Sequence, residues 1–404
     1  MITKRTTGLF AATVTTGLTV ALGGCGSSGE AAHGHRAHPA AARTTTAAAA
    51  QRGTAAKSAE PAPLAGMPPV LNPKDLYAAD RPGKLSPVVR KFPSLVYVPN
   101  TNSNTVNVID PKTYKVIRTI PVGVQPQHVV PSWDLKTLWV NNDRGNTLTP
   151  INPANGKVGK TLDVHDPYNL YFTPNGKYAI VMASLDRQLV FRDPHTMKIK
   201  KTLPVTCSGV NHADFSADGR YFIVSCEFSG ELLKVDTEKM KVVGQQKLPF
   251  KGAMPQDVKI SPDGRTFYIA DMMADGMWVL PADKFTTPKL VHTGKGCHGL
   301  YISRDSKEMY ISNRGEGTIS VFSFPQDKLI KKWVLPGGGS PDMGGVSANG
   351  KVLWLTGRYN AEVYAIDTTS GKQLARIPVG SGPHGLAVYP QPGRYSLGHT
   401  GIFR

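Results

Sequence analysis

A short turn motif that recurs through most of the chain limits the possible folds more than any other feature of the sequence. It appears roughly every 42 residues, a period that is typical of repeat architectures. The copies are SWDL at 132, TPNG at 173, SADG at 216, SPDG at 261, SRDS at 303 and SANG at 347, with a degenerate YPQPG at 389. Each copy lies beside short apolar runs. Asp-Gly or Asn-Gly between two such runs predicts a β-hairpin, because these residues tolerate positive φ.

The number of repeats predicts how the fold closes. Six complete units start near residues 126, 167, 210, 255, 297 and 341, and each holds four short strands, as a propeller blade does. Three strands are left over in 94–121 and one in 382–389. We expect the last strand to pair with the first three, because this pairing closes the ring and leaves no free sheet edge. The predicted fold class is therefore all-β: a seven-bladed β-propeller with four-stranded antiparallel blades.

Three stretches carry a resemblance to a known family. YVPNTNSNTVNVID, SPDGRTFYIAD and GPHGLAVYP resemble the YVTN-repeat (YncE-like) β-propellers, many of which are exported bacterial proteins, and the resemblance covers residues 94–390. It implies the fold but leaves function open, because propellers host unrelated activities. Two relatives by architecture, the propellers of cytochrome-type nitrite reductase and nitrous oxide reductase, use histidines to bind haem and copper. No motif in this chain matches either enzyme closely enough to transfer residues.

The first 25 residues predict export and lipidation. Two basic residues, Lys4 and Arg5, precede a moderately apolar run at 9–22, and the stretch ends in LGGC at Cys25. This pattern is that of a secretory signal, and its small residues before Cys25 resemble a bacterial lipobox. We expect a signal peptide at 1–24 and an extracytoplasmic protein anchored to the cell membrane by a lipid on Cys25. The alternative is an ordinary signal peptide with an incidental cysteine.

The composition after Cys25 predicts the domain boundaries. Residues 25–90 are rich in Ala, Thr and Pro, a composition that buries too little apolar surface to fold, so we expect a disordered tether. The propeller should then occupy 91–392 and a C-terminal tail 393–404. The histidines of AHGHRAH, which are His33, His35 and His38, could bind a metal ion weakly or belong to a solvated linker.

The net charge of +18 favours negatively charged partners. For an exported protein these partners are anionic wall polymers and lipid headgroups before nucleic acid, so we do not expect nucleic-acid binding. The partners expected are an anionic ligand, a cell-wall polymer or a protein, and we expect a monomer.

Strand alternation assigns the loops to two faces of the ring. With strands lettered A to D from the axis outward, the D-to-A connectors and the B-to-C loops must share one face, here called the mouth face. We expect four histidines at the starts of inner strands and four arginines to lie there: His128, His212, His298, His384, Arg144, Arg187, Arg314 and Arg358. Convergent polar groups at a concave mouth predict a binding site.

The residue types at the mouth suggest two kinds of ligand. Arginine suits carboxylate, phosphate or a haem propionate, and imidazole suits Zn, Cu or haem iron. His128 and His212 lie four residues before the turn motif but His298 and His384 lie five, so strict alternation predicts that the two pairs point to opposite sides of the strand. Our leading hypothesis is a binding protein without catalysis of its own. The alternative is a redox or cofactor-handling enzyme that holds haem or copper in the mouth.

Two cysteines are candidates for a disulfide. Cys207 ends a D-to-A connector and Cys226 ends the B strand of the same blade, so both reach the mouth face. A bond between them would close a loop of about 18 residues and contribute roughly 3 kcal/mol in the chain-entropy view. Two unpaired thiols are the alternative.

Overall fold

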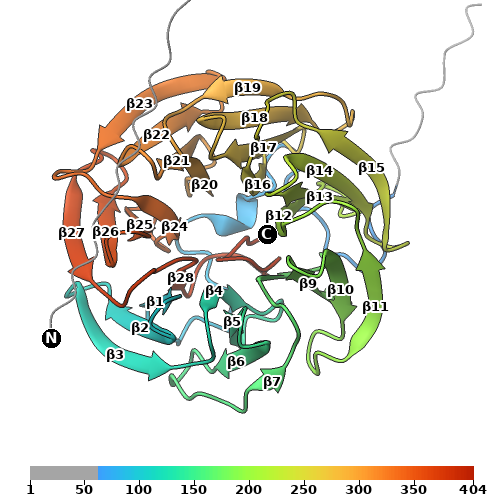
Figure 1. Ribbon diagram of the computed structural model, residues 1–404. Helices are drawn as coiled ribbons and strands as arrows, with labels where there is room; N and C mark the ends of the chain where they lie inside the picture. Colours follow the sequence, from blue (N-terminus) through green and yellow to red (C-terminus); the bar gives the residue numbers. More distant parts are fainter. Residues whose placement is uncertain (1–61) are drawn as a thin grey trace, which may run out of the picture. The chain divides into compact units, whose positions relative to one another are not determined.

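The computed structural model describes residues 62–404 and shows a ring of seven four-stranded antiparallel sheets (Figure 1). The predicted seven-bladed propeller is therefore confirmed. The predictions for the signal peptide, Cys25 and the tether histidines fall on residues 1–61, outside the described part of the chain. No helix within residues 62–404 is long and apolar enough to cross a membrane.

Four concentric rings of strands make up the blades. The innermost strands, A, are β28 (Ala387–Tyr389), β4 (Pro126–Pro131), β8 (Asn169–Phe172), β12 (Val210–Phe215), β16 (Pro255–Ile260), β20 (Cys297–Ile302) and β24 (Pro341–Val346). The B strands are β1 (Leu95–Asn100), β5 (Leu138–Asn142), β9 (Ala179–Ala183), β13 (Tyr221–Cys226), β17 (Thr266–Asp271), β21 (Glu308–Asn313) and β25 (Val352–Gly357). The C strands are β2 (Thr105–Asp110), β6 (Thr147–Ile151), β10 (Gln188–Arg192), β14 (Glu231–Asp236), β18 (Gly276–Pro281), β22 (Thr318–Ser323) and β26 (Glu362–Asp367). The outermost strands, D, are β3 (Lys115–Pro121), β7 (Leu162–Asp163), β11 (Ile199–Pro204), β15 (Lys241–Lys247), β19 (Lys289–His292), β23 (Lys328–Val334) and β27 (Gln373–Pro378).

The ring closes as the repeat count predicts. The last strand, β28, pairs antiparallel with β1, with Leu95 opposite Tyr389 and Tyr97 opposite Ala387. The first blade thus combines strands from the two ends of the propeller, and its inner strand comes from the end of the chain.

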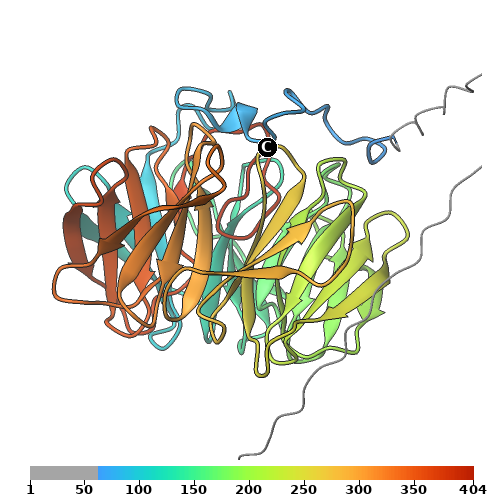
Figure 2. The ribbon, with the colours of Figure 1, turned by 90° about the horizontal axis from the view of Figure 1, so that it is seen from above.

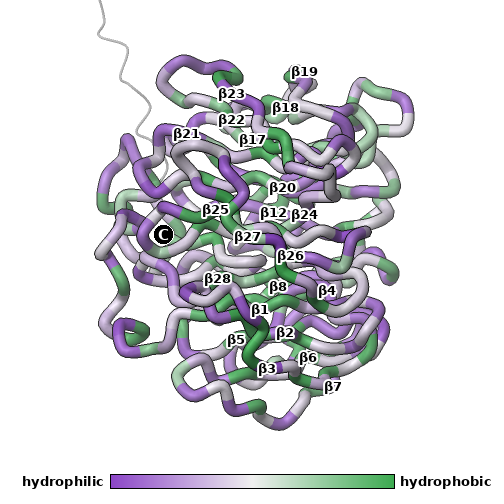
Figure 3. The backbone as a smooth tube through the Cα atoms, turned by 90° about the vertical axis from the view of Figure 1, so that its left-hand side faces the viewer, coloured by the Kyte–Doolittle hydropathy of each residue, from purple (hydrophilic) through white to green (hydrophobic). Residues whose placement is uncertain are grey.

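Burial falls from the axis outward. The A strand β12 is fully buried, whereas the D strand β15 alternates exposed and half-buried residues along its whole length. The apolar clusters lie between neighbouring blades; one of them joins Val96 and Val98 of the first blade to Trp354 of the seventh. In the side view of Figure 3, hydrophobic stretches follow strands such as β1 and β17, and many connecting loops are hydrophilic. Much of the buried apolar surface therefore lies between blades, where its removal from water stabilises the ring.

A repeated asparagine at the end of the B strand holds the loops of the mouth face. Asn142 donates through Nδ2 to Thr147 Oγ1 at 3.1 Å and to Thr149 Oγ1 at 2.9 Å in the next strand. Asn313 makes the equivalent pair of bonds to two hydroxyl groups at 3.0 Å. These buried bonds tie each B-to-C loop to its own blade, which fixes the rim of the mouth.

The segment 62–94 lies on the face opposite to the mouth, across the turn motifs of the repeat. Leu64 N donates to Asp218 O at 2.8 Å, and Leu76 N donates to Pro262 O at 2.7 Å. The segment contains the 3-10 helix η1 (Ala78–Asp80), and Tyr77 and Val89 are buried. The structure therefore corrects the expected tether boundary: residues 62–90 belong to the propeller domain. The low apolar content that predicted a tether is an average over 25–90, which hides the apolar residues near its end.

The C-terminal tail turns into the centre of the ring, where Figures 1 and 2 place the end of the chain. Within the axis, Phe172 N donates to Leu397 O at 2.9 Å and His399 N donates to Leu170 O at 2.8 Å, so the tail lies against β8. The Arg404 guanidinium forms a buried ion pair with Asp214 of β12 at 3.0 Å. No sequence pattern predicts a role for this tail. The structure shows that the tail fills part of the channel.

Candidate ligand site in the propeller channel

The four histidines predicted at the mouth meet on the ring axis. The ring centroids are 5.6 Å apart for His128 and His212, 6.5 Å for His212 and His298, 5.8 Å for His298 and His384, and 5.0 Å for His384 and His128. At most 2% of each residue is exposed. Four blades therefore contribute one imidazole each to a single buried cluster, here called the channel cluster.

The prediction that these histidines form two sets with opposite orientations is wrong. It assumed strict alternation along the inner strands, but those strands begin with irregular pairing. The register shifts between Val210 and His212, and again between Cys297 and Leu300. A β-bulge adds a residue and changes the direction of the following side chains, so histidines at different spacings from the turn motif point to one place.

A fifth imidazole, His399, joins the cluster from the C-terminal tail. Its ring centroid lies 4.9 Å from that of His212 and 5.3 Å from that of His128. One possible ligand atom from each of these three histidines lies within 4.8 Å of the other two. Sequence patterns do not predict the place of His399, because it lies after the last repeat and has no repeat position from which to infer its location.

Hydrogen bonds fix the proton positions on three of the imidazoles. His128 Nδ1 lies 2.9 Å from Tyr168 O, His212 Nδ1 lies 3.1 Å from Asn211 Oδ1, and His384 Nδ1 lies 2.7 Å from Asp342 Oδ2. Each of these partners is an acceptor, so Nδ1 carries the proton and Nε2 has a free lone pair. The three Nε2 atoms are buried and have no hydrogen-bond partner within residues 62–404.

Burial keeps the imidazoles neutral. It lowers the pKa of all five from the usual value, and the pKa of His128 falls to about 3. The charge of Arg358 acts in the same direction on His128 and His384. At neutral pH the channel cluster therefore offers lone pairs and no positive charge of its own.

Asp342 connects the cluster to an arginine. Its Oδ1 accepts from Arg314 Nη1 at 3.1 Å and lies 3.0 Å from His298 Nδ1. Burial alone would raise the pKa of Asp342, but the ring N–H groups of His298 and His384 and the charge of Arg314 outweigh burial and hold that pKa well below its usual range. The carboxylate stays ionised and orients the rings that it contacts.

The four predicted arginines separate into two pairs. The Arg314 side chain is nearly buried and contacts Asp342. Arg358 is half-buried, and its Nη1 donates to Thr101 Oγ1 at 2.9 Å and to Gly382 O at 3.2 Å. Within the described chain, no carboxylate lies within ion-pair distance of Arg358. The structure does not bring Arg144 and Arg187 into the cluster: both are exposed, and Arg144 Nε donates to Gln125 Oε1.

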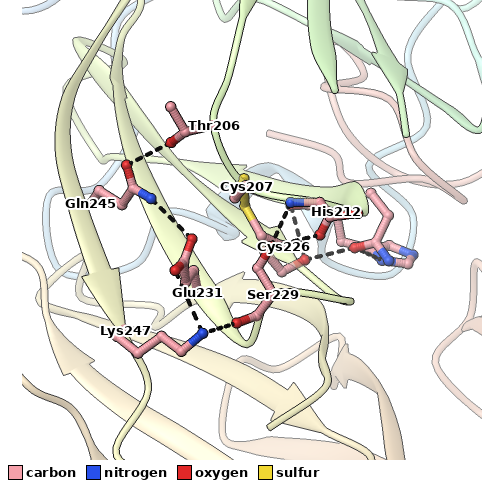
Figure 4. Close-up of a disulfide and its surroundings, with 11 residues drawn as sticks. Thr206, Cys207, His212, Cys226, Ser229, Glu231, Gln245 and Lys247 are labelled. Carbon is pink, nitrogen blue, oxygen red and sulfur yellow. Dashed lines mark hydrogen bonds and ion pairs between the residues drawn. A yellow bond between two sulfur atoms is a disulfide. The ribbon is translucent and has the colours of Figure 1, made fainter. Parts of the chain in front are cut away.

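A disulfide joins Cys207 and Cys226 close to His212, as Figure 4 shows. The two Cα atoms are 6.0 Å apart. The bond fixes the connector that leads into β12 to the end of β13, where Ser225 Oγ donates to Asn211 Oδ1 at 2.8 Å. It therefore stabilises the blade that presents His212. Among residues 62–404 the remaining cysteine, Cys297, is a buried free thiol whose pKa burial raises to about 12.

The fold and this site define a seven-bladed β-propeller with a histidine-lined axial channel. The chain belongs to the YNCE-like beta-propeller family, whose family model matches residues 62–393. No curated protein matches it in sequence.

Several solved structures are similar to the chain. Hydrazine synthase of Kuenenia stuttgartiensis has a TM-score of 0.57 and 17% identity, and the match covers 70% of this chain and 98% of that one. A functionally unknown protein from Desulfotomaculum acetoxidans has a TM-score of 0.61 and 16% identity, and the match covers 73% of this chain and 98% of that one. Dihydro-heme d1 dehydrogenase NirN, in complex with DHE, has a TM-score of 0.56 and 15% identity, and the match covers 81% of this chain and 79% of that one. At such identities the similarity shows the fold alone.

Proposed function

We propose that this protein is an extracytoplasmic binding protein, anchored to the membrane by a lipid on Cys25, that takes an anionic ligand at the mouth of its channel. The observation that carries the proposal is Arg358. This half-buried guanidinium is held at the mouth by two neutral oxygen atoms, from Thr101 and Gly382, and not by a carboxylate. A partly desolvated cation with neutral partners is suited to an incoming carboxylate or phosphate oxygen.

The surroundings of Arg358 support this proposal. The net charge of +18 attracts anions to the whole molecule. Exposed apolar side chains in the B-to-C loops, namely Phe228, Met273 and Tyr359, offer contact surface around the mouth. The proposal assigns binding to this face and no chemical reaction.

The alternative hypothesis of a bound haem fits the channel poorly. The imidazoles fill the axis with ring centroids as close as 4.9 Å, and the tail occupies the space next to them. A flat macrocycle needs an open slot between its axial ligands, and the channel cluster leaves none. We therefore do not propose haem for this channel, whereas a bare ion such as copper is compatible with its dimensions.

The test is a titration of metal-free protein with a short teichoic-acid fragment as the anionic probe. Loss of a charge-assisted bond from Arg358→Ala should lower affinity about tenfold or more, and wild-type affinity should fall as salt rises. Arg144→Ala is the matched control, because Arg144 is an exposed arginine on the same face. Equal affinity of Arg358→Ala and Arg144→Ala would exclude the mouth as the anion site.

A further inference from the structure

We infer that the channel cluster is a binding site for a late first-row transition-metal ion of the Zn²⁺ or Cu²⁺ type, held by His128, His212 and His399, with His384 beside them. The inference goes beyond the proposed anion site and does not depend on it. Its basis is the arrangement of lone pairs in the channel.

Four Nε2 atoms of the channel imidazoles have no hydrogen-bond partner within the described chain. The Nε2 atoms of His128, His212, His384 and His399 are all buried, and none has a hydrogen-bond partner within the described chain. Unpartnered buried polar atoms are rare because each one loses its interaction with water. Several in one place point to a group that all of them contact. A cation that accepts nitrogen lone pairs would satisfy the unprotonated Nε2 atoms together, and His399 Nε2 as well once its proton has moved to Nδ1.

The imidazoles are oriented as metal ligands usually are. A metal-bound histidine typically donates its other ring N–H to a carbonyl or carboxylate, which fixes the free nitrogen toward the metal. His128 does this through the Tyr168 carbonyl, and His384 does it through the Asp342 carboxylate. The Nε2 lone pairs are thus preset without any rearrangement.

A longer chain of contacts fixes His212. Asn211 Nδ2 donates to Glu227 Oε2 at 2.7 Å, which sets the orientation of the amide. Asn211 Oδ1 therefore faces His212 Nδ1 and accepts from it. Asn211 is in this sense a positioning residue, because it determines which nitrogen of His212 is free.

His399 needs one adjustment to serve as a ligand. Its Nδ1 lies 3.0 Å from Asn169 Nδ2, so in the present arrangement Nδ1 accepts and Nε2 carries the proton. Rotating the Asn169 amide would place Oδ1 opposite Nδ1, move the proton there and free Nε2, in exchange for the bonds that the amide now makes with Leu170 N at 2.9 Å and Asn211 O at 3.2 Å. Asp257 Oδ1, which has no hydrogen-bond partner and lies 3.6 Å from His399 Nε2, adds a negative charge that offsets the charge of the ion.

The spacing suits an ion after small movements of the rings. One possible ligand atom from each of His128, His212 and His399 lies within 4.8 Å of the other two. Tetrahedral coordination with metal–nitrogen bonds of about 2.0–2.1 Å requires nitrogen separations of about 3.3 Å, so the nitrogen atoms would approach one another by at most about 1.5 Å. Nitrogen ligands without thiolate favour Zn²⁺, Cu²⁺ or Ni²⁺ over Mg²⁺ or Ca²⁺.

The experiment uses the full chain with His33, His35 and His38 replaced by alanine, so that the histidines before residue 62 cannot contribute. Protein dialysed against a chelator is titrated with Zn²⁺ by calorimetry, and with Cu²⁺ for electron paramagnetic resonance. We expect one equivalent of each ion, with nitrogen hyperfine structure on the Cu²⁺ signal. His212→Ala should abolish this equivalent. The matched control is His292→Ala, which removes an exposed histidine outside the channel and should bind like the parent.

A second variant keeps the test valid if His212→Ala does not fold. Asn211→Ala retains every imidazole but removes the acceptor for His212 Nδ1, and such changes lower metal affinity 10–100-fold. Binding of less than one equivalent by the parent, or equal affinity of the parent, His212→Ala and Asn211→Ala, would overturn the inference. Because the anion titration uses metal-free protein and Arg358→Ala, either site can fail without the other.

Discussion

At the scale of single residues, the repeat predicted which histidines lie near the axis but not how they point. His128, His212 and His298 lie near the starts of inner strands and His384 lies just before β28, and position in the repeat was enough to place them on one face. Their orientation depends on bulges that no turn motif signals. The sequence also could not pair Asp342 with His298, His384 and Arg314, because these contacts join different blades.

The channel cluster should make the stability of the protein sensitive to acid. The pKa of His128 is lowered to about 3, chiefly by burial, whereas the unfolded chain has a histidine pKa of about 6.5. Between these values the unfolded state binds more protons, so the free energy of unfolding falls as pH falls from 6.5, by about 1.4 kcal/mol per pH unit for each such imidazole. Buried acids with a raised pKa, such as Asp257, have the opposite effect, so the contribution of His128 must be isolated.

A comparison of variants isolates that contribution. Chemical unfolding of metal-free protein gives the free energy of unfolding at each pH between 6 and 4. The slope of this free energy against pH should be lower in His128→Gln than in the wild type by about 1.4 kcal/mol per pH unit. His292→Gln, at an exposed position, should have the wild-type slope. A wild-type slope in His128→Gln would mean that this imidazole is charged in the folded protein.

At the scale of elements, local pattern predicted the strands because turn chemistry and apolar alternation agree in every repeat. It failed at both ends of the domain, where no repeat exists. The segment 62–94 is held by backbone bonds to turns of distant blades, such as Leu76 N to Pro262 O, and the tail is held against β8. Both segments are specified by surfaces that only the complete ring provides.

The disulfide is an element-scale feature that stabilises one blade. Cys207 and Cys226 enclose a connector and most of a hairpin, with a sequence separation of 19. The double variant Cys207→Ser/Cys226→Ser should lose roughly 3 kcal/mol of unfolding free energy, because its unfolded chain is less restricted. Urea unfolding with and without reductant measures the effect. Reductant should destabilise the wild type by a similar amount and leave the double variant unchanged; insensitivity of the wild type would show that the bond does not form.

At the scale of the whole molecule, we propose that a lipid on Cys25 anchors the propeller to the membrane. The first described residues lie on the face opposite to the mouth, where Leu64 contacts Asp218. Cys25→Ser should therefore release a folded protein that still binds its ligands into the medium. Fractionation of cells and incorporation of labelled fatty acid measure this. A wild type that takes up no label, or a variant that stays with the membrane, contradicts the anchor.

Ring closure depends on β28, the last strand of the chain. Two truncations can distinguish the effect of closing the ring from the effect of the tail that fills part of the channel. Deletion from Gly382 onward removes β28, so β1 is left with an unpaired edge, and we expect aggregation. Deletion from Gln391 onward keeps β28 but removes buried tail residues such as Leu397 and Phe403. This protein should stay monomeric with a lower melting temperature, because its ring is closed while its channel is emptier. Size-exclusion chromatography and thermal unfolding compare the two. If the longer deletion is also monomeric, closure by β28 is not what protects the ring from self-association.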